Sequence, residues 1–250
     1  MLELKDKLIV ALDVPTLKEA KKIVDILYPT VRIFKIGSQL FTAYGPEAVR
    51  MVGEKGGKVF LDLKFHDIPN TVSCSIGTGS TISILPRPAD VGKEIKNVVT
   101  FPVFMMTVHI KGGRLMLEAA VKGAIEKAKE LNIERPLIVG VTRLTSEDNN
   151  ANKLDEVLQA AQLAKDSGLD GVVCSALEAA AVRKTYGKDF IIVTPSIRQD
   201  RVNVDDQKRT ATAAEAVKAG SDFLVIGRPI IKADDPLKMA REILSSISIQ

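Results

Sequence analysis

Several residue types that mark particular protein classes are scarce in this sequence. The 250 residues include no tryptophan, two cysteines and two histidines. Cys74 and Cys174 are too few for a disulfide framework, and no cluster of cysteine, histidine and glutamate suggests a metal site. We therefore expect neither structural disulfides nor a bound metal.

Long apolar segments are also missing. No apolar run approaches the roughly 20 residues that a membrane-spanning helix needs. The N-terminal segment, residues 1–7, is mixed in charge and leads directly into a strand-like run, which is not the pattern of a signal peptide. These absences favour a cytoplasmic protein that does not associate with a membrane.

A strong excess of one charge is absent as well. The formal net charge is +4, and no basic cluster is interleaved with aromatic residues. We therefore expect no nucleic-acid partner. A few basic groups that bind an anionic small molecule would explain the balance equally well.

What the sequence does contain is a regular alternation of strand-like and helix-like segments, with no break that would mark a domain boundary. Repeated βα units predict parallel strands, and eight units in about 250 residues are typical of a (β/α)8 TIM barrel. An open doubly wound sheet is the alternative, but the glycine-rich turn that it would need after the first strand is missing. We predict an α/β protein with one TIM-barrel domain over residues 1–250. Its strands are expected at residues 8–12, 31–36, 59–64, 103–108, 137–141, 171–174, 190–193 and 223–226.

One segment interrupts this alternation. Residues 73–90 read SCSIGTGSTISILPRPAD, are rich in serine, glycine and proline, and show no sustained helical period until Val91. Turns from strand to helix usually take about 2–6 residues. We therefore predict that residues 73–90 are a loop inserted into the third βα connection.

The third predicted strand carries charges where apolar residues are expected, at Asp62 and Lys64, and Asp67 follows it. Residues two apart on a strand face the same side, so Asp62 and Lys64 should point together. In a TIM barrel the carboxyl ends of the strands meet at one mouth, to which the first two strands would bring Asp13 and Lys35. Alternating signs would keep the four groups ionised in a partly dry site. We interpret this cluster as an active site, in preference to a structural ion pair.

The other side of the same mouth has the features of a phosphate site. Gly227-Arg228-Pro229 follows the eighth strand. Glycine lets backbone N–H groups approach an anion, arginine offers a bidentate fork, and proline suits the first turn of a helix. The loop after the seventh strand adds Arg198, with Gln207 further along it. Phosphate sites at these two loops are common in this fold.

These motifs resemble those of the orotidine 5′-phosphate decarboxylase family. The run LDLKFHDIPNT is the most specific, and ALDV, FKIG, VTRLTS, LDGVVCSA, TPSIR, DDQKR and IGRPI occur with it in the same order. The resemblance covers about residues 7–240 except 73–90. It implies a TIM barrel that works as a homodimer without cofactor and converts orotidine 5′-phosphate to UMP and CO2 in pyrimidine biosynthesis. One departure is Ser196, which stands where the family usually has glycine.

The resemblance assigns roles to the charged cluster. Asp13 and Lys35 match residues that hold the ribose and the charged network, and Asp62 and Lys64 match the catalytic pair. Loss of CO2 from C6 leaves a carbanion in the plane of the ring, which no adjacent π-system delocalises. A cation fixed near C6 is then the main stabiliser available, and Lys64 can supply it and afterwards the proton.

The family also implies roles for residues outside this cluster. Asp67, Ile68 and Thr71 match residues that reach into the partner subunit's site, and Asp67 is one of the catalytic residues. Thr145 matches a contact to the pyrimidine edge. The matches to phosphate contacts are Arg198, Gln207, Gly227 and Arg228.

Two alternatives remain open. A Mg²⁺-dependent sugar-phosphate decarboxylase or aldolase of the same barrel superfamily shares the D-x-K-x-x-D run, but such enzymes typically use a glutamate on an earlier strand, where this sequence has Lys35. A nucleotide-binding barrel whose turnover is impaired by the 73–90 insertion is the other.

Overall fold

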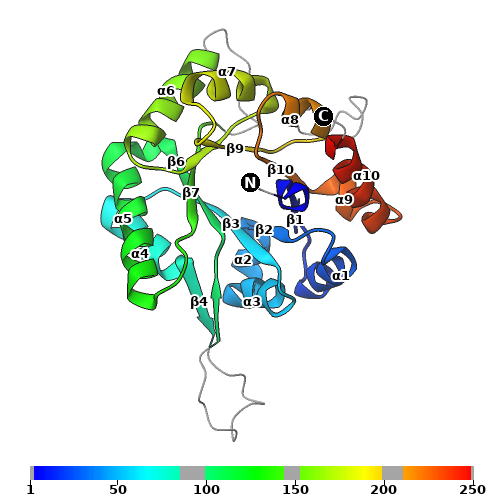
Figure 1. The fold of residues 1–250 in the computed structure, drawn as a ribbon. Coiled ribbons are helices and arrows are strands. Elements are labelled where there is room, and N and C mark those ends of the chain that lie inside the picture. The colour runs from blue at the N-terminus through cyan, green and yellow to red at the C-terminus, as the bar shows by residue number, and fades with distance from the viewer. Residues whose placement is uncertain (1–2, 85–98, 144–152, 199–210, 249–250) are drawn as a thin grey trace, which may run out of the picture.

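The computed structural model describes residues 3–84, 99–143, 153–198 and 211–248. Eight parallel strands close into a barrel in the order β1-β10-β9-β8-β7-β6-β3-β2 (Figure 1). The predicted TIM barrel is therefore confirmed. Its strands are β1 (Leu8–Ala11), β2 (Ile33–Gly37), β3 (Lys58–Phe65), β6 (Met105–His109), β7 (Leu137–Val141), β8 (Gly171–Val173), β9 (Ile191–Thr194) and β10 (Phe223–Ile226).

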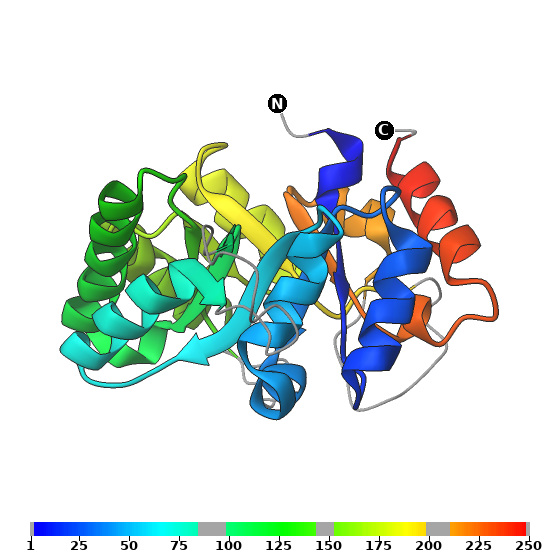
Figure 2. The same cartoon turned by 90° about the horizontal axis from the view of Figure 1, so that it is seen from below.

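Helices surround the ring of strands (Figure 1). A 3₁₀ turn at Leu4–Lys7 lies at one end of the barrel, near the C-terminal end of the last helix, and the strands lead from this end towards the mouth (Figure 2). No helix in the described ranges is both long and apolar enough to cross a membrane. The helices are α1 (Leu17–Leu27), α2 (Ser38–Tyr44), α3 (Pro46–Glu54), α4 (Pro69–Ser80), α5 (Gly113–Leu131), α6 (Lys153–Asp166), α7 (Ala176–Tyr186), α8 (Ala213–Lys218), α9 (Arg228–Ile231) and α10 (Pro236–Ser248).

Strand residues alternate between two apolar cores. Leu8 and Val10 of β1 belong to the larger core, whereas Ile9 and Ala11 belong to the smaller core inside the barrel. Because the period is two, the residue two positions beyond the last inward apolar side chain comes to the mouth. The buried members of the inner core are Ile9, Ala11, Ile33, Phe60, Met105, Val139, Val193, Phe223 and Val225.

The prediction of a loop insertion at residues 73–90 is wrong for residues 73–84. Residues 73–80 continue helix α4, and strand β4 (Thr81–Ile84) then pairs antiparallel with β5 (Val99–Pro102). Residues 85–90 and the expected helical restart at Val91 lie outside the described residues. The third βα connection is short, because β3 ends at Phe65 and α4 begins at Pro69. The extra hairpin instead follows α4, in the connection to β6.

Close packing explains why α4 is helical despite its serine and glycine content. Its buried residues include Val72 and Ile76, which recur at helical spacing. A Cβ atom on Gly123 of α5 would lie 2.3 Å from the carbonyl oxygen of Ser73, so the glycine permits a close approach of the two helices. Tertiary packing therefore outweighs the weak intrinsic helix propensity of this segment.

The β4–β5 hairpin lies away from the mouth. It follows α4 and precedes β6, which places it at the end of the barrel where the strands begin, and it projects outward from there (Figure 1). Phe101 of the hairpin packs on α3, where a Cβ atom on Gly53 would lie 2.2 Å from the Phe101 ring. The alternative of a barrel impaired in turnover by an inserted loop assumed an insertion into the third βα connection, and that connection is short.

Candidate active site

A cavity of about 440 Å³ opens at the carboxyl ends of the barrel strands. It combines both halves of the predicted site, the charged cluster and the phosphate loops. Thr145 and Gln207 lie outside the described residues. The predicted residues that line the cavity are Asp13, Lys35, Asp62, Lys64, Arg198, Gly227 and Arg228.

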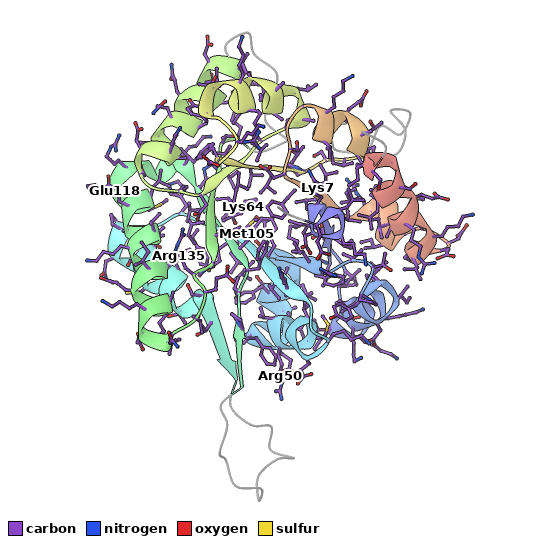
Figure 3. All side chains as sticks on the ribbon, in the orientation of Figure 1. Lys7, Arg50, Lys64, Met105, Glu118 and Arg135 are labelled. Atoms are coloured by element: carbon purple, nitrogen blue, oxygen red, sulfur yellow. The ribbon has the colours of Figure 1, made fainter. Side chains whose placement is uncertain are left out.

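The alternation of the strands places the charged side chains in this cavity. Ile33 and Phe60 belong to the inner core, and Lys35 and Asp62 follow them at the next inward positions of β2 and β3. The side chains of Lys64 and Met105 lie within the ring of strands, whereas Glu118 and Arg50 lie on the surrounding helices (Figure 3). The apolar inner core thus forms the floor on which the charged cluster rests.

The four charged side chains form a continuous chain of ion pairs with alternating signs. The Nζ atom of Lys35 lies 3.3 Å from Oδ1 of Asp13 and 3.4 Å from Oδ2 of Asp62. The Nζ atom of Lys64 donates to both carboxylate oxygens of Asp62 at 3.0 Å. Asp62 is therefore shared by two ammonium groups.

Neighbouring charges keep the buried members of the chain ionised. Burial acts to raise the pKa of Asp62, but the Lys35 and Lys64 ammonium groups and a hydrogen bond from Thr107 hold it below its ordinary value. Burial acts to lower the pKa of Lys35, but Asp62 and Asp13 raise it overall. The Asp62 side chain is 12% exposed and that of Lys64 is 36% exposed, so Lys64 is the more accessible partner.

A bulge in β3 aims Lys64 into the cavity. Leu61 pairs with Met106 and Phe65 with Val108, so the three residues from Asp62 to Lys64 lie opposite Thr107 alone. Lys64 has a φ of 51°, in the left-handed region that favours glycine. Asp62 and Lys64 do point together, as predicted, but through this distorted backbone and not through a regular strand.

Thr107 is a site residue that the sequence analysis missed. It is fully buried on β6. Its Oγ1 atom accepts a hydrogen bond from the backbone N–H of Lys64 at 2.8 Å and donates one to Oδ1 of Asp62 at 3.0 Å. One hydroxyl therefore joins both ends of the bulge. The only signal for it was a polar residue within the otherwise apolar run Met105–Val108.

The opposite wall of the cavity carries the loops predicted to bind phosphate. Gly227 caps the one-turn helix α9, whose first turn contains Pro229, and Ile230 N–H donates to the Gly227 carbonyl at 2.9 Å. Arg198 is held by its backbone N–H, which donates to Ala211 O at 2.9 Å. Arg198 and Arg228 both line this wall and make it cationic.

Two further cationic residues, neither of them predicted from the sequence, line the cavity. Arg143 follows β7 and makes an ion pair with Glu156 of α6. Lys232 follows α9. Arg143 could have been found by the period-two rule, since Val139 and Val141 precede it at inward positions of the same strand.

Three predicted residues lie on the surface of the chain. Asp67, Ile68 and Thr71 are exposed, and Ile68 retains 66% of its accessible surface. Asp67 accepts a hydrogen bond from the backbone N–H of Ile68 at 2.6 Å. Among the described residues that line the cavity, none comes from this segment.

The chain is similar to known proteins along most of its length. The model of the "Orotidine 5'-phosphate decarboxylase / HUMPS family" matches residues 6–85 and 88–243. The orotidine 5′-phosphate decarboxylase of Moorella thermoacetica is 44% identical over 254 residues, which cover 98% of this chain and 93% of that protein. The enzyme of the same name from Coxiella burnetii is 43% identical over 240 residues, covering 93% and 92%.

Solved structures show the same fold. The crystal structure of orotidine 5′-phosphate decarboxylase from Lactobacillus acidophilus matches with a TM-score of 0.76 and 32% identity, covering 97% of this chain and 99% of that chain. An uncharacterised conserved protein from Geobacillus kaustophilus matches with a TM-score of 0.76 and 34% identity, covering 96% and 99%.

Proposed function

Because the chain belongs to the orotidine 5′-phosphate decarboxylase / HUMPS family, we propose that it converts orotidine 5′-phosphate to UMP and CO2 in pyrimidine biosynthesis, with Lys64 as the residue that stabilises and protonates C6. The chain is an enzyme, as its relatives named orotidine 5′-phosphate decarboxylase are. The observation that supports the role of Lys64 is its place in the cavity, at one end of the chain of ion pairs and bound to the buried Asp62.

The proposed step needs a cation and a proton at the same place. The C6–carboxylate bond breaks, CO2 leaves, and the electron pair remains on C6. The Lys64 ammonium stabilises this charge and then donates its proton to form the C6–H bond. Asp62 holds Lys64 in position, and Lys35 keeps Asp62 ionised. In this mechanism no cofactor takes part.

The rest of the nucleotide is bound by the other walls of the cavity. Asp13 and Lys35 hold the ribose, and Thr145 contacts the pyrimidine edge. A cationic phosphate site far from C6 can use its binding energy to organise the mouth. The residues proposed for this phosphate site are Arg198, Gln207, Gly227 and Arg228.

We propose that the enzyme acts as a homodimer in which Asp67, Ile68 and Thr71 complete the partner's site. Their exposure and their absence from the described lining of the chain's own cavity support this arrangement. The proposed location is the cytoplasm, to which the low cysteine content and the soluble substrate are suited.

An absorbance assay tests the activity. The purified chain is mixed with orotidine 5′-phosphate in the presence of EDTA, and the loss of the orotate absorbance is followed. We expect full turnover, because the mechanism uses only side chains. Absence of turnover would refute the proposal, and turnover that EDTA abolishes would favour a Mg²⁺-dependent enzyme.

Subunit mixing tests the shared site. Lys64→Ala and Asp67→Ala should each be inactive alone. If Asp67 acts across the interface, a mixed dimer has one intact site, so an equal mixture should recover about a quarter of wild-type activity. Failure of the mixture to recover activity, although exchange of labelled subunits is demonstrated, would place Asp67 in its own subunit's site.

A further inference from the structure

Three non-glycine residues in the described ranges have φ angles in the left-handed region: Lys64, Asn132 and Ser196. Asn132 ends helix α5, and its backbone N–H donates to carbonyl groups of the last turn, which is a common use of asparagine. Lys64 is held by Asp62 and Thr107. For Ser196 the described ranges supply no comparable hydrogen bond to the side chain.

Ser196 carries two separate energetic costs. Its φ is 64°, a conformation that glycine adopts without strain. Its side chain is also buried, with the residue only 6% exposed, and its Oγ atom has no hydrogen-bond partner within the described part of the chain. A buried hydroxyl without a partner is unfavourable, and glycine would remove both costs.

The position of Ser196 indicates what could satisfy the hydroxyl. The residue lies in the loop after β9, between the inner-core residue Val193 and the cationic Arg198. It lines the same cavity as Lys64 and Arg228. The unpaired hydroxyl therefore belongs to the wall of the candidate active site.

We propose that Ser196 is a further substrate-binding residue, whose hydroxyl donates a hydrogen bond to an oxygen of the bound nucleotide. This inference rests on the proposed function, since a nucleoside monophosphate presents acceptor oxygens on its phosphate, ribose and pyrimidine. The bound state would then satisfy the hydroxyl, and the cost of the left-handed serine would be offset by ligand affinity.

Binding of UMP to paired variants tests the proposal. Ser196→Ala removes the hydroxyl and keeps the Cβ atom, whereas Ser196→Gly removes both and relieves the backbone. We expect each variant to bind UMP about 3- to 10-fold more weakly in isothermal titration calorimetry, the range typical of one hydrogen bond. Ser196→Gly should at the same time raise the melting temperature, a combination that a purely structural role would not produce.

Asn132→Gly is the matched control, because it makes the same change at a left-handed residue that ends α5 and does not line the cavity. It should leave the UMP affinity unchanged. Unchanged affinity in both Ser196 variants would overturn the proposal, and so would weakening in Ser196→Gly alone, since loop flexibility would then explain it. A wild-type chain that turns over no substrate would instead refute the proposed function itself.

Discussion

At the mouth of the barrel one buried carboxylate, Asp62, is shared by Lys35 and Lys64, whereas at the opposite end Asp170 and Asp222 each pair with one arginine. Arg135 donates two parallel hydrogen bonds to Asp170, at 2.8 and 2.7 Å. This bidentate pair leaves no oxygen of Asp170 without a guanidinium donor. Both ends thus use ion pairs, but Arg135 and Asp170 bind each other through both carboxylate oxygens, whereas Asp62 is shared by two lysines.

A second pair of an aspartate and an arginine occurs two strands further along the barrel, before β10. Asp222 accepts from Arg183 at 2.5 Å and from the backbone N–H of Ile192 at 2.8 Å. Asp170 likewise accepts from the backbone N–H of Ile138 at 2.7 Å. Each aspartate directly precedes a barrel strand and binds the strand beside it, so these pairs fix the register between neighbouring strands.

The difference separates stability from function. At the opposite end Asp170 and Asp222 accept hydrogen bonds from arginines and from backbone N–H groups of the protein itself. At the mouth Lys64 has three donor hydrogens, two acceptors on Asp62 and an accessible position, so it retains capacity for a ligand. The left-handed backbone of Lys64 also occurs at this end. Substitutions of Lys64 and Thr107 at the mouth should therefore lower turnover, whereas substitution of Asp170 at the opposite end should lower stability and leave turnover unchanged.

Lys64→Ala should show the largest effect. Removing the cation and proton donor should lower the turnover number by about a thousandfold or more, while UMP still binds through the remaining walls of the cavity. The absorbance assay and calorimetric titration with UMP measure the two quantities. Substantial turnover in this variant would refute the role given to Lys64.

Thr107→Val should give the next largest effect on activity. Valine has nearly the same shape but cannot join Asp62 to the backbone of Lys64, so the turnover number should fall by about 10- to 100-fold with little change in UMP affinity. Thr107→Ser keeps the hydroxyl and should restore most of the turnover. If valine and serine lower turnover equally, the hydroxyl is not what positions Lys64.

Asp170→Asn should affect stability alone. The change leaves Arg135 without its carboxylate, and we expect a loss of about 2 kcal/mol in the free energy of unfolding, or about 4–8 °C in melting temperature. Turnover measured well below the melting temperature should be unchanged. Glu126→Gln, which breaks the exposed pair with Lys122, is the control and should have almost no effect. Loss of turnover without loss of stability in Asp170→Asn would contradict the separation of the two ends.

The smallest effect concerns pH. The pKa of Asp62 in the folded state lies below its ordinary value of 3.8, so its contribution to stability is present above that value and is lost as the pH falls through the folded-state pKa. The free energy of unfolding of the wild type, relative to that of Asp62→Asn, should therefore decrease as the pH falls below about 4. Urea denaturation at a series of pH values measures this difference, and a difference independent of pH would contradict it.

Much of the fold and part of the site could be predicted because they depend on period and order. The eight barrel strands follow from short apolar runs between helical segments, and their observed ranges lie within a few residues of the predicted ones. Asp13, Lys35 and Asp62 follow from the same reasoning, because each continues an inward row of its strand. The positions of Arg198, Gly227 and Arg228 on the opposite wall follow from strand order.

Other features could not be predicted because they depend on contacts between distant segments. Residues 73–80 of helix α4 were expected to belong to a loop, since serine and glycine disfavour helices in isolation. Its formation depends on the close approach that Gly123 of α5 allows. Thr107 was missed for a similar reason, because its significance arises only when β6 lies beside the bulge of β3.

The chain by itself determined the parallel barrel and which charged residues reach its mouth, because the period of two in each strand carries a side chain inward or outward wherever the strand lies. Only the tertiary structure decided how those charges are held. The bulge that turns Lys64 towards Asp62, the hydroxyl of Thr107 that joins them and the left-handed backbone of Ser196 all depend on neighbours far away in sequence. Local preference opposes two of these three features, and the surrounding packing overrides it.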